Sequence, residues 1–202
     1  GASWGITLQS AIGNIPRQDH PELEVISLFG GTVRPVNFNS FGIASGLAEQ
    51  LGATYSILAA PNFLSKGIDR DAFLSQEQFG QHFAKFEQLD AAILTCSDIS
   101  SKSYLISEGL PPDVSEADLI AAGAVGDVVG RFLDQNGFEV ANPLSARCIG
   151  ISLDTLMRVP TRVLVAGGPH KVKTIRAVLR RGIANTLVTD DVTAELLLQD
   201  AP

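Results

Sequence analysis

The sequence predicts one α/β domain with a largely parallel sheet and a small antiparallel insertion. Short runs of β-forming residues alternate with stretches whose apolar residues recur at helical spacing, which is typical of parallel strands joined by helices. The dipeptide Asn136-Gly137 falls out of phase with this alternation and is a strong signal for a hairpin turn. The 202 residues contain no internal repeat and no linker of biased composition, so we expect residues 1–202 to form a single domain.

The first half of the chain is expected to contain three helices and three strands. Ile43, Leu47 and Leu51 share one face of a helix that Gly52 ends. Phe79, Phe83 and Phe86 recur at helical intervals in the next long helix. In chain order we expect a helix at residues 8–12, a strand at 23–29, a helix at 40–52, a strand at 54–58, a helix at 76–89 and a strand at 91–96.

The second half begins with a capping pattern, in which Ser115 is followed three residues later by Asp118. That pattern predicts a short helix that ends near Gly123. A strand at residues 126–133, the turn at Asn136-Gly137 and a strand at 138–140 form the expected insertion. After them we expect a strand at residues 148–151, a helix at 153–157, a strand at 162–166, a helix at 171–181, a strand at 186–189 and a closing helix from Asp190.

Composition and charge exclude several classes of protein. A formal net charge of −7 argues against a surface that grips nucleic acid, because phosphate neutralisation needs a basic face. No apolar run approaches the roughly 20 residues that span a bilayer. Cys96 and Cys148 lie in apolar runs, which favours buried free thiols and a cytoplasmic location. Met157 is the only methionine and no strand precedes the loop at residues 3–7, so we expect a fragment of a longer protein.

Three glycine-containing loops lie where an α/β sheet binds its ligands, at strand ends that lead into helices. They are Ser3-Trp4-Gly5-Ile6-Thr7, Phe29-Gly30-Gly31-Thr32 and Ala166-Gly167-Gly168. Glycine lets the backbone approach an anion, and the free amides of a first helical turn point at it, with Ser3 or Thr7 as hydroxyl donors. Each pair alone is more typical of a tight turn, but three together predict a site for a phosphorylated small molecule. No dinucleotide or ATP fingerprint is present, and we expect no cofactor.

Lys171 and Asp127 are the charged residues that we expect at such a site. Lys171 lies in the first turn of a helix, where a cation opposes the helix dipole unless it faces an anion. Asp127 enters an apolar strand, where a carboxylate is costly unless it has a partner. The alternatives are a solvated lysine and a turn-capping aspartate. Asn37 and Asn39 could also bind hydroxyls or carbonyls, although such turns often serve local needs alone.

No metal site and no catalytic nucleophile is expected. His20, His82 and His170 have no ligand-like spacing with acids or cysteines, and no G-x-S-x-G motif occurs.

These residues give the chain a resemblance to a known family. It resembles the effector-binding domain of the SorC/DeoR-type bacterial sugar-responsive transcriptional regulators, over essentially its whole length. The matching pieces, in family order, are Ser3-Trp4-Gly5-Ile6-Thr7-Leu8, Phe29-Gly30-Gly31, Asn39 before Leu47-Ala48, Ala60-Pro61, Gly123-Ala124-Val125-Gly126-Asp127, Ala166-Gly167-Gly168 with Lys171, and Leu187-Val188-Thr189-Asp190 before Thr193-Ala194.

The resemblance implies a Rossmann-like three-layer fold, similar to the ribose-phosphate isomerase and glucosamine-phosphate deaminase group. It implies that the first two loops, through Ser3, Gly5, Thr7, Gly30 and Gly31, hold a phosphate. Asn39, Asp127 and Lys171 complete the expected ligand-binding set. It further implies a homo-oligomer, dimer or tetramer, that contacts DNA only through an N-terminal helix-turn-helix absent from this chain. The family often has a basic residue where this chain has Ile6, which leaves a non-phosphorylated sugar or polyol open.

Two functions from different classes follow. The first is ligand sensing, in which a sugar phosphate or polyol controls DNA binding by the full-length protein without turnover. The alternative is a sugar-phosphate isomerase of the same fold, with Asp127 as the general base. A pure oligomerisation domain is a third and less specific interpretation.

Overall fold

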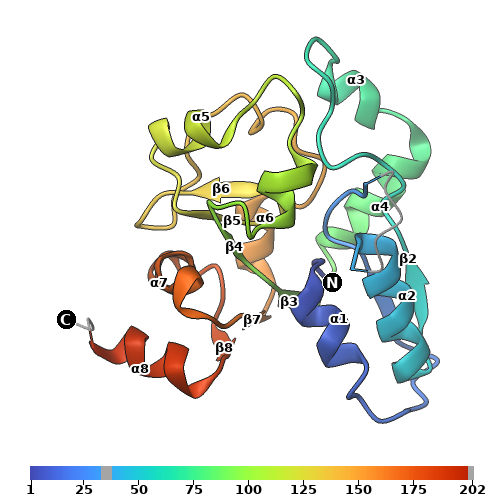
Figure 1. Cartoon of the computed structure of the whole chain (residues 1–202). Helices are drawn as coiled ribbons and strands as arrows, with labels where there is room; N and C mark the ends of the chain where they lie inside the picture. The colour runs from blue at the N-terminus through green and yellow to red at the C-terminus, as the bar shows by residue number, and fades with distance from the viewer. Residues whose placement is uncertain (33–37, 200–202) are drawn as a thin grey trace.

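A computed structural model describes residues 1–32 and 38–199 (Figure 1). Its elements in chain order are α1 (Ile6–Ile12), β1 (Glu24–Ile26), α2 (Ser40–Leu51), β2 (Thr54–Ser56), α3 (Arg70–Leu74), α4 (Glu77–Phe86), β3 (Ala91–Leu94), β4 (Ser97–Asp98), the π-helix η1 (Leu105–Gly109), α5 (Glu116–Ala121), β5 (Gly126–Val128), β6 (Arg131–Leu133), α6 (Leu153–Arg158), β7 (Thr161–Val165), the 3₁₀-helix η2 (Pro169–Lys171), α7 (Val172–Arg181), β8 (Thr186–Val188) and α8 (Asp191–Gln199).

The parallel strands lie in two groups, β1–β2 and β3–β7–β8, and the first residues of the chain join them. Ala2 forms parallel bridges to Ser27 on one side and to Ile93 on the other. The Ala2 amide donates to Ile26 O at 2.8 Å, and the Ser3 amide donates to Ile93 O at 2.9 Å. Figure 1 accordingly places the N-terminus between the two groups. No regular strand precedes the loop at residues 3–7, as expected, yet residues 1–3 lie between the two strand groups because Ala2 bridges to both.

Helix α2 shows why the apolar spacing was informative. Ile43, Ala44, Leu47 and Ala48 are buried, and Gly52 ends the helix in the left-handed conformation at φ 62°. The α/β class and the largely parallel sheet are confirmed. None of the helices in the described residues is both long and apolar enough to cross a membrane.

The antiparallel insertion contains β4, β5 and β6, in that order. Residues 126–133, expected as one strand, are divided by a tight turn at Val129 and Gly130, whose φ angles are 48° and 74°. The hairpin at Asn136-Gly137 is confirmed, because Leu133 and Glu139 form an antiparallel bridge across it. The insertion is thus a double hairpin.

Other differences concern short elements. Helix α3, strand β4 and helix η1 were not expected, and residues 148–151 form only isolated bridges to Phe63 and Phe29. The capping box at Ser115 and Asp118 is confirmed, with both reciprocal hydrogen bonds present.

Candidate functional site

One cavity opens beside residues 1–3, where the order of the parallel strands reverses. The chain runs from residues 1–3 outward through β1 and β2, and then returns to place β3 on the opposite side of residues 1–3. Ligands of open α/β sheets bind at such a switch point, beyond the carboxyl ends of the strands. A pocket of about 670 Å³, its open mouth included, lies there and is lined by Trp4, Gly5, Ile6, Thr7, Phe38, Thr95, Cys96, Ser97, Asp98, Lys102, Ser103, Tyr104, Leu105, Asp127, Val129, His170 and Lys171.

The loop after residues 1–3 supplies the first wall. Gly5 has φ 129°, which a side chain would strain, and α1 has no side-chain cap. The first amides of a helix have no intrahelical acceptor, so those of Ile6 and Thr7 remain available at the cavity. Ser3 lies behind this wall, because its buried hydroxyl is 3.1 Å from the Thr95 hydroxyl and 3.3 Å from Trp4 O.

The loop after β3 supplies the second wall and was missed by the sequence analysis. Thr95 Oγ1 donates to Trp4 O at 2.5 Å, which ties the two loops together. Cys96 lines the cavity as an inert group, because burial raises the pKa of its thiol to about 12. The polar run Thr95–Asp98 directly follows a strand, and this position in the sequence could have indicated a ligand-binding loop.

Asp127 lies at the base of the cavity, on β5. Only 5% of the surface of Asp127 is exposed to solvent. Burial raises the pKa of this carboxyl to about 6, opposed by hydrogen bonds from the Ser97 hydroxyl and the Gly130 amide and by the nearby Lys171 charge. The Gly130 amide donates to Oδ2 at 3.0 Å, and the Ser97 hydroxyl donates to Oδ1.

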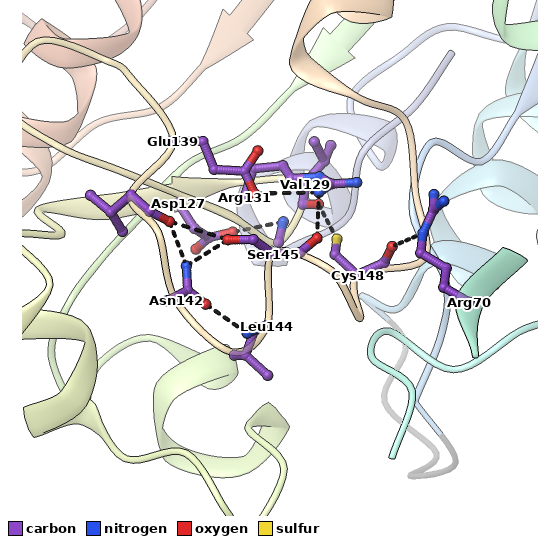
Figure 2. A network of polar contacts seen from close by, with 11 residues as sticks. Arg70, Asp127, Val129, Arg131, Glu139, Asn142, Leu144, Ser145 and Cys148 are labelled. Carbon is purple, nitrogen blue, oxygen red and sulfur yellow. Dashed lines mark hydrogen bonds and ion pairs between the residues drawn. The ribbon is translucent and has the colours of Figure 1, made fainter. Parts of the chain in front are cut away.

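A polar network supports the β5–β6 hairpin, which carries Asp127 (Figure 2). Arg131 Nη1 donates to Ser145 O at 3.0 Å and lies 3.3 Å from Glu139 Oε1. The Cys148 thiol donates to Val129 O at 3.7 Å, on the turn itself. Because this turn carries a β-branched residue at positive φ, the network has to maintain a conformation that Val129 disfavours.

Lys171 enters the cavity from η2, beyond β7. It lines the pocket next to His170, and its charge acts on the pKa of Asp127. The Gly168 amide does not face the pocket, since it donates to Thr193 Oγ1 at 2.7 Å and to Asp190 Oδ2 at 3.1 Å. This turn therefore contributes the side chains of His170 and Lys171 to the cavity, while the Gly168 amide is used in hydrogen bonds within the protein.

Aromatic side chains form an apolar wall. The Tyr104 ring makes edge contacts with Phe38 at 5.1 Å and with Trp4 at 5.8 Å between centroids. The buried Tyr104 hydroxyl has no hydrogen-bond partner among the described residues. A buried donor without a partner is costly, so this wall favours a ligand with polar groups.

Three predicted residues lie elsewhere. The Gly30 amide donates to Ile149 O and the Gly31 amide to Ala60 O, at 2.8 and 2.7 Å, so neither is free for a phosphate. Asn39 caps α2 by accepting from the Gly42 amide at 2.7 Å. Gly31 and Asn39 line a separate apolar groove. Asn37 lies outside the described residues.

The predicted set thus divides in two. Gly5, Thr7, Asp127 and Lys171 meet at one cavity with Ser3 behind them, and Gly30, Gly31 and Asn39 do not reach it. Within residues 1–32 and 38–199, no three His, Cys, Asp or Glu side chains gather in a way that could hold a metal ion.

Comparisons with known proteins show similarity over nearly the whole chain. The family model described as "Putative sugar-binding domain" matches residues 1–199. The chain is 30% identical over 201 residues to the erythritol catabolism regulatory protein EryD of Brucella abortus, covering 98% of this chain and 62% of that protein. It is 27% identical to the deoxyribonucleoside regulator of Bacillus subtilis, covering 99% of this chain and 64% of that protein.

A solved structure extends the likeness to the fold. A DeoR family transcriptional regulator from Listeria monocytogenes matches with a TM-score of 0.88 at 26% identity, over 98% of this chain and 78% of that one. The chain spans less than two thirds of the length of the two curated relatives.

Proposed function

The chain belongs to the sugar-binding domain family of the SorC/DeoR-type bacterial transcriptional regulators, and from this premise we propose that its switch-point cavity is the effector site. The effector is a phosphorylated sugar or polyol, and its binding controls DNA binding by the full-length protein. The names of the relatives refer to erythritol, which is a polyol, and to deoxyribonucleosides, which contain a sugar; the phosphate is part of the proposal and is not in either name.

The observation that carries the proposal is the pairing of Asp127 and Lys171 at one cavity. A buried carboxylate accepts hydrogen bonds from ligand hydroxyls, while the lysine lines the same cavity as the uncapped start of α1 and supplies a positive charge for an anion. The aromatic wall of Trp4, Phe38 and Tyr104 offers a surface for the carbon skeleton. On the side of the phosphate, the proposed contacts are Thr7 and the close backbone approach at Gly5, whose own amide donates to Phe38 O at 2.9 Å.

The regulatory part of the proposal concerns the longer protein. A ligand changes DNA binding only if it binds two states of that protein with different affinity. We propose a homo-oligomer, dimer or tetramer, that contacts DNA through a segment outside this chain and works in the cytoplasm. Two buried free cysteines are compatible with a reducing compartment.

A sugar-phosphate isomerase is the second candidate, because a buried carboxyl with a pKa of about 6 in a cavity could act as a general base. The proposed likeness of the fold to the ribose-phosphate isomerase and glucosamine-phosphate deaminase group is common to both candidates. The relatives named as regulators favour sensing. Isomerisation of pentose or hexose phosphates that Asp127→Asn abolishes would overturn the sensor proposal.

Calorimetric titration tests the sensor proposal directly. A panel of phosphorylated and free sugars and polyols should contain at least one compound that binds saturably and raises the melting temperature. Both effects should be lost in Asp127→Asn. The exposed Asp154, replaced by Asn, is the matched control and should bind as the wild type does. A panel without any saturable binder would contradict the proposal.

A further inference from the structure

Two serines outside the predicted site form a hydrogen-bonded chain that ends on Asp127. The hydroxyl of Ser103, a residue that is 6% exposed, donates to Ser97 Oγ at 3.0 Å. The Ser97 hydroxyl donates in turn to Asp127 Oδ1. Since β4 and β5 are paired so that Ser97 lies directly opposite Asp127, the backbone fixes this contact.

The hydrogen bonds leave the carboxylate with spare capacity on both oxygens. A carboxylate has about four acceptor positions, two on each oxygen. Within the described part of the chain, Oδ1 accepts from Ser97 and Oδ2 accepts from the Gly130 amide, one donor each. One further position on each oxygen is open, on a residue that lines the cavity. Two adjacent acceptors match two hydroxyl groups on neighbouring carbons.

We propose that Ser97, supported by Ser103, is a positioning residue for Asp127, and that the carboxylate it orients recognises two neighbouring hydroxyl groups of the ligand. This inference rests on the proposed function and specifies the ligand as a vicinal diol. Ser97 acts through Asp127, because its single hydroxyl proton is already used in that bond.

Charge explains why such a residue is needed. Burial disfavours the ionised carboxyl, and the Ser97 hydrogen bond is the largest of the effects that lower the pKa again. Without that bond, Asp127 would be protonated at higher pH and would lose acceptor capacity. The titratable groups that face Asp127 from the surrounding elements are Cys96, Asp98, Lys102, Tyr104, Cys148, His170 and Lys171.

The first test needs no ligand. In protein labelled with ¹³C at aspartate carboxyls, the Asp127 titration midpoint should rise by about one pH unit in Ser97→Ala. Ser103→Ala should shift it in the same direction by less, and Ser97→Thr, which keeps the hydroxyl, should restore it. Ser75, whose hydroxyl donates to Ala72 O on the exposed end of α3, gives the matched Ser→Ala control with no shift. An unchanged midpoint in a folded Ser97→Ala protein overturns the positioning role.

The second test uses ligand pairs that differ by one hydroxyl group. Ribose 5-phosphate and 2-deoxyribose 5-phosphate, in their furanose forms, make one pair, and erythritol 4-phosphate and its 2-deoxy analogue make another. In each pair the deoxy compound has no two hydroxyl groups on neighbouring carbons. For the pair that binds, we expect the complete diol to bind at least about tenfold more tightly to the wild type. Equal affinities would overturn the recognition of neighbouring hydroxyls.

The pH profile connects the two tests. Wild-type affinity for the binding probe should rise with pH as Asp127 ionises, and Ser97→Ala should move that rise to higher pH. Titration of the ligand phosphate cancels in the comparison because both proteins bind the same probe. If no compound of either pair or of the wider panel binds, the proposed function fails and the diol assignment fails with it, while the ligand-free titration still decides the role of Ser97.

Discussion

Replacing Asp127 by Asn should stabilise the unliganded protein at neutral pH and at the same time abolish effector binding. The carboxyl is buried, and its pKa is raised from the ordinary 3.8 to about 6 although two hydrogen bonds and Lys171 oppose the rise. The folded protein therefore holds the proton more tightly than the unfolded chain does. Stability is consequently lost as the pH rises from 3.8 through about 6.

The size of the effect follows from the same values. At about 1.4 kcal/mol for each pKa unit, the ionised carboxylate costs about 3 kcal/mol of stability above pH 6. An Asn side chain resembles the protonated acid, and its carbonyl can still accept from the Gly130 amide. We expect a gain of about 1–3 kcal/mol at pH 7.5, which corresponds to roughly 3–10 °C in melting temperature for a domain of this size.

Urea unfolding at pH 4 and pH 7.5 measures this difference. The stability gain of Asp127→Asn over the wild type should be present at pH 7.5 and small at pH 4, whereas Asp154→Asn should show neither pattern. An Asn variant that is less stable than the wild type at pH 7.5 would refute the reasoning. It would mean that the protein already satisfies the carboxylate, which would then offer little to a ligand.

Three further substitutions test other parts of the site. Lys171→Ala should abolish the ligand-induced rise in melting temperature, while the free energy of unfolding of the unliganded protein should change by no more than about 0.5 kcal/mol. A surviving rise would remove Lys171 from the site. Gly31→Ala should leave that rise intact, because among the described residues its Cβ would meet only Ala60 O, at 4.0 Å. Loss of the rise would return this turn to the site. Gly130→Ala should cost about 3 kcal/mol in urea unfolding, since φ is 74° and the new Cβ would lie 2.4 Å from the buried Phe29 ring. A cost below about 1 kcal/mol would show that the turn relaxes easily.

The longer elements could be predicted because their apolar residues repeat over several turns. Helices α2, α4 and α7 bury the faces that their spacing indicates. The short α3 and η1 have too few residues for any repeat to be visible. The turn at Val129 was unpredictable for another reason, because a β-branched residue is among the least expected at positive φ and only Gly130 marks the place.

The glycine turns show what sequence alone can misplace. All three have the residues of an anion site, yet tertiary contacts occupy a glycine amide in each of them. Asp190, just before α8, and Thr193, within α8, accept from Gly168, and the backbone of residues 60 and 149 accepts from Gly31 and Gly30. The Gly5 amide donates to Phe38 O at 2.9 Å, whereas the Ile6 and Thr7 amides that follow it stay open at the cavity. Whether an amide is free depends on partners distant in sequence, and no local pattern contains them.

Ser97 and Thr95 were missed for a reason that lies in strand order. A switch point can be located only when it is known which two strands lie side by side there, and residues 1–3 are one of the two. Because these three residues are too short to be expected as a strand, the partner loop after β3 had no reason to be singled out. Once they are placed next to β3, the polar run Thr95–Asp98 and the loop at Gly5 must face each other across the crevice. The same adjacency puts Ser97 opposite Asp127, so the positioning role proposed for this serine depends on the sheet topology and not on any motif of its own.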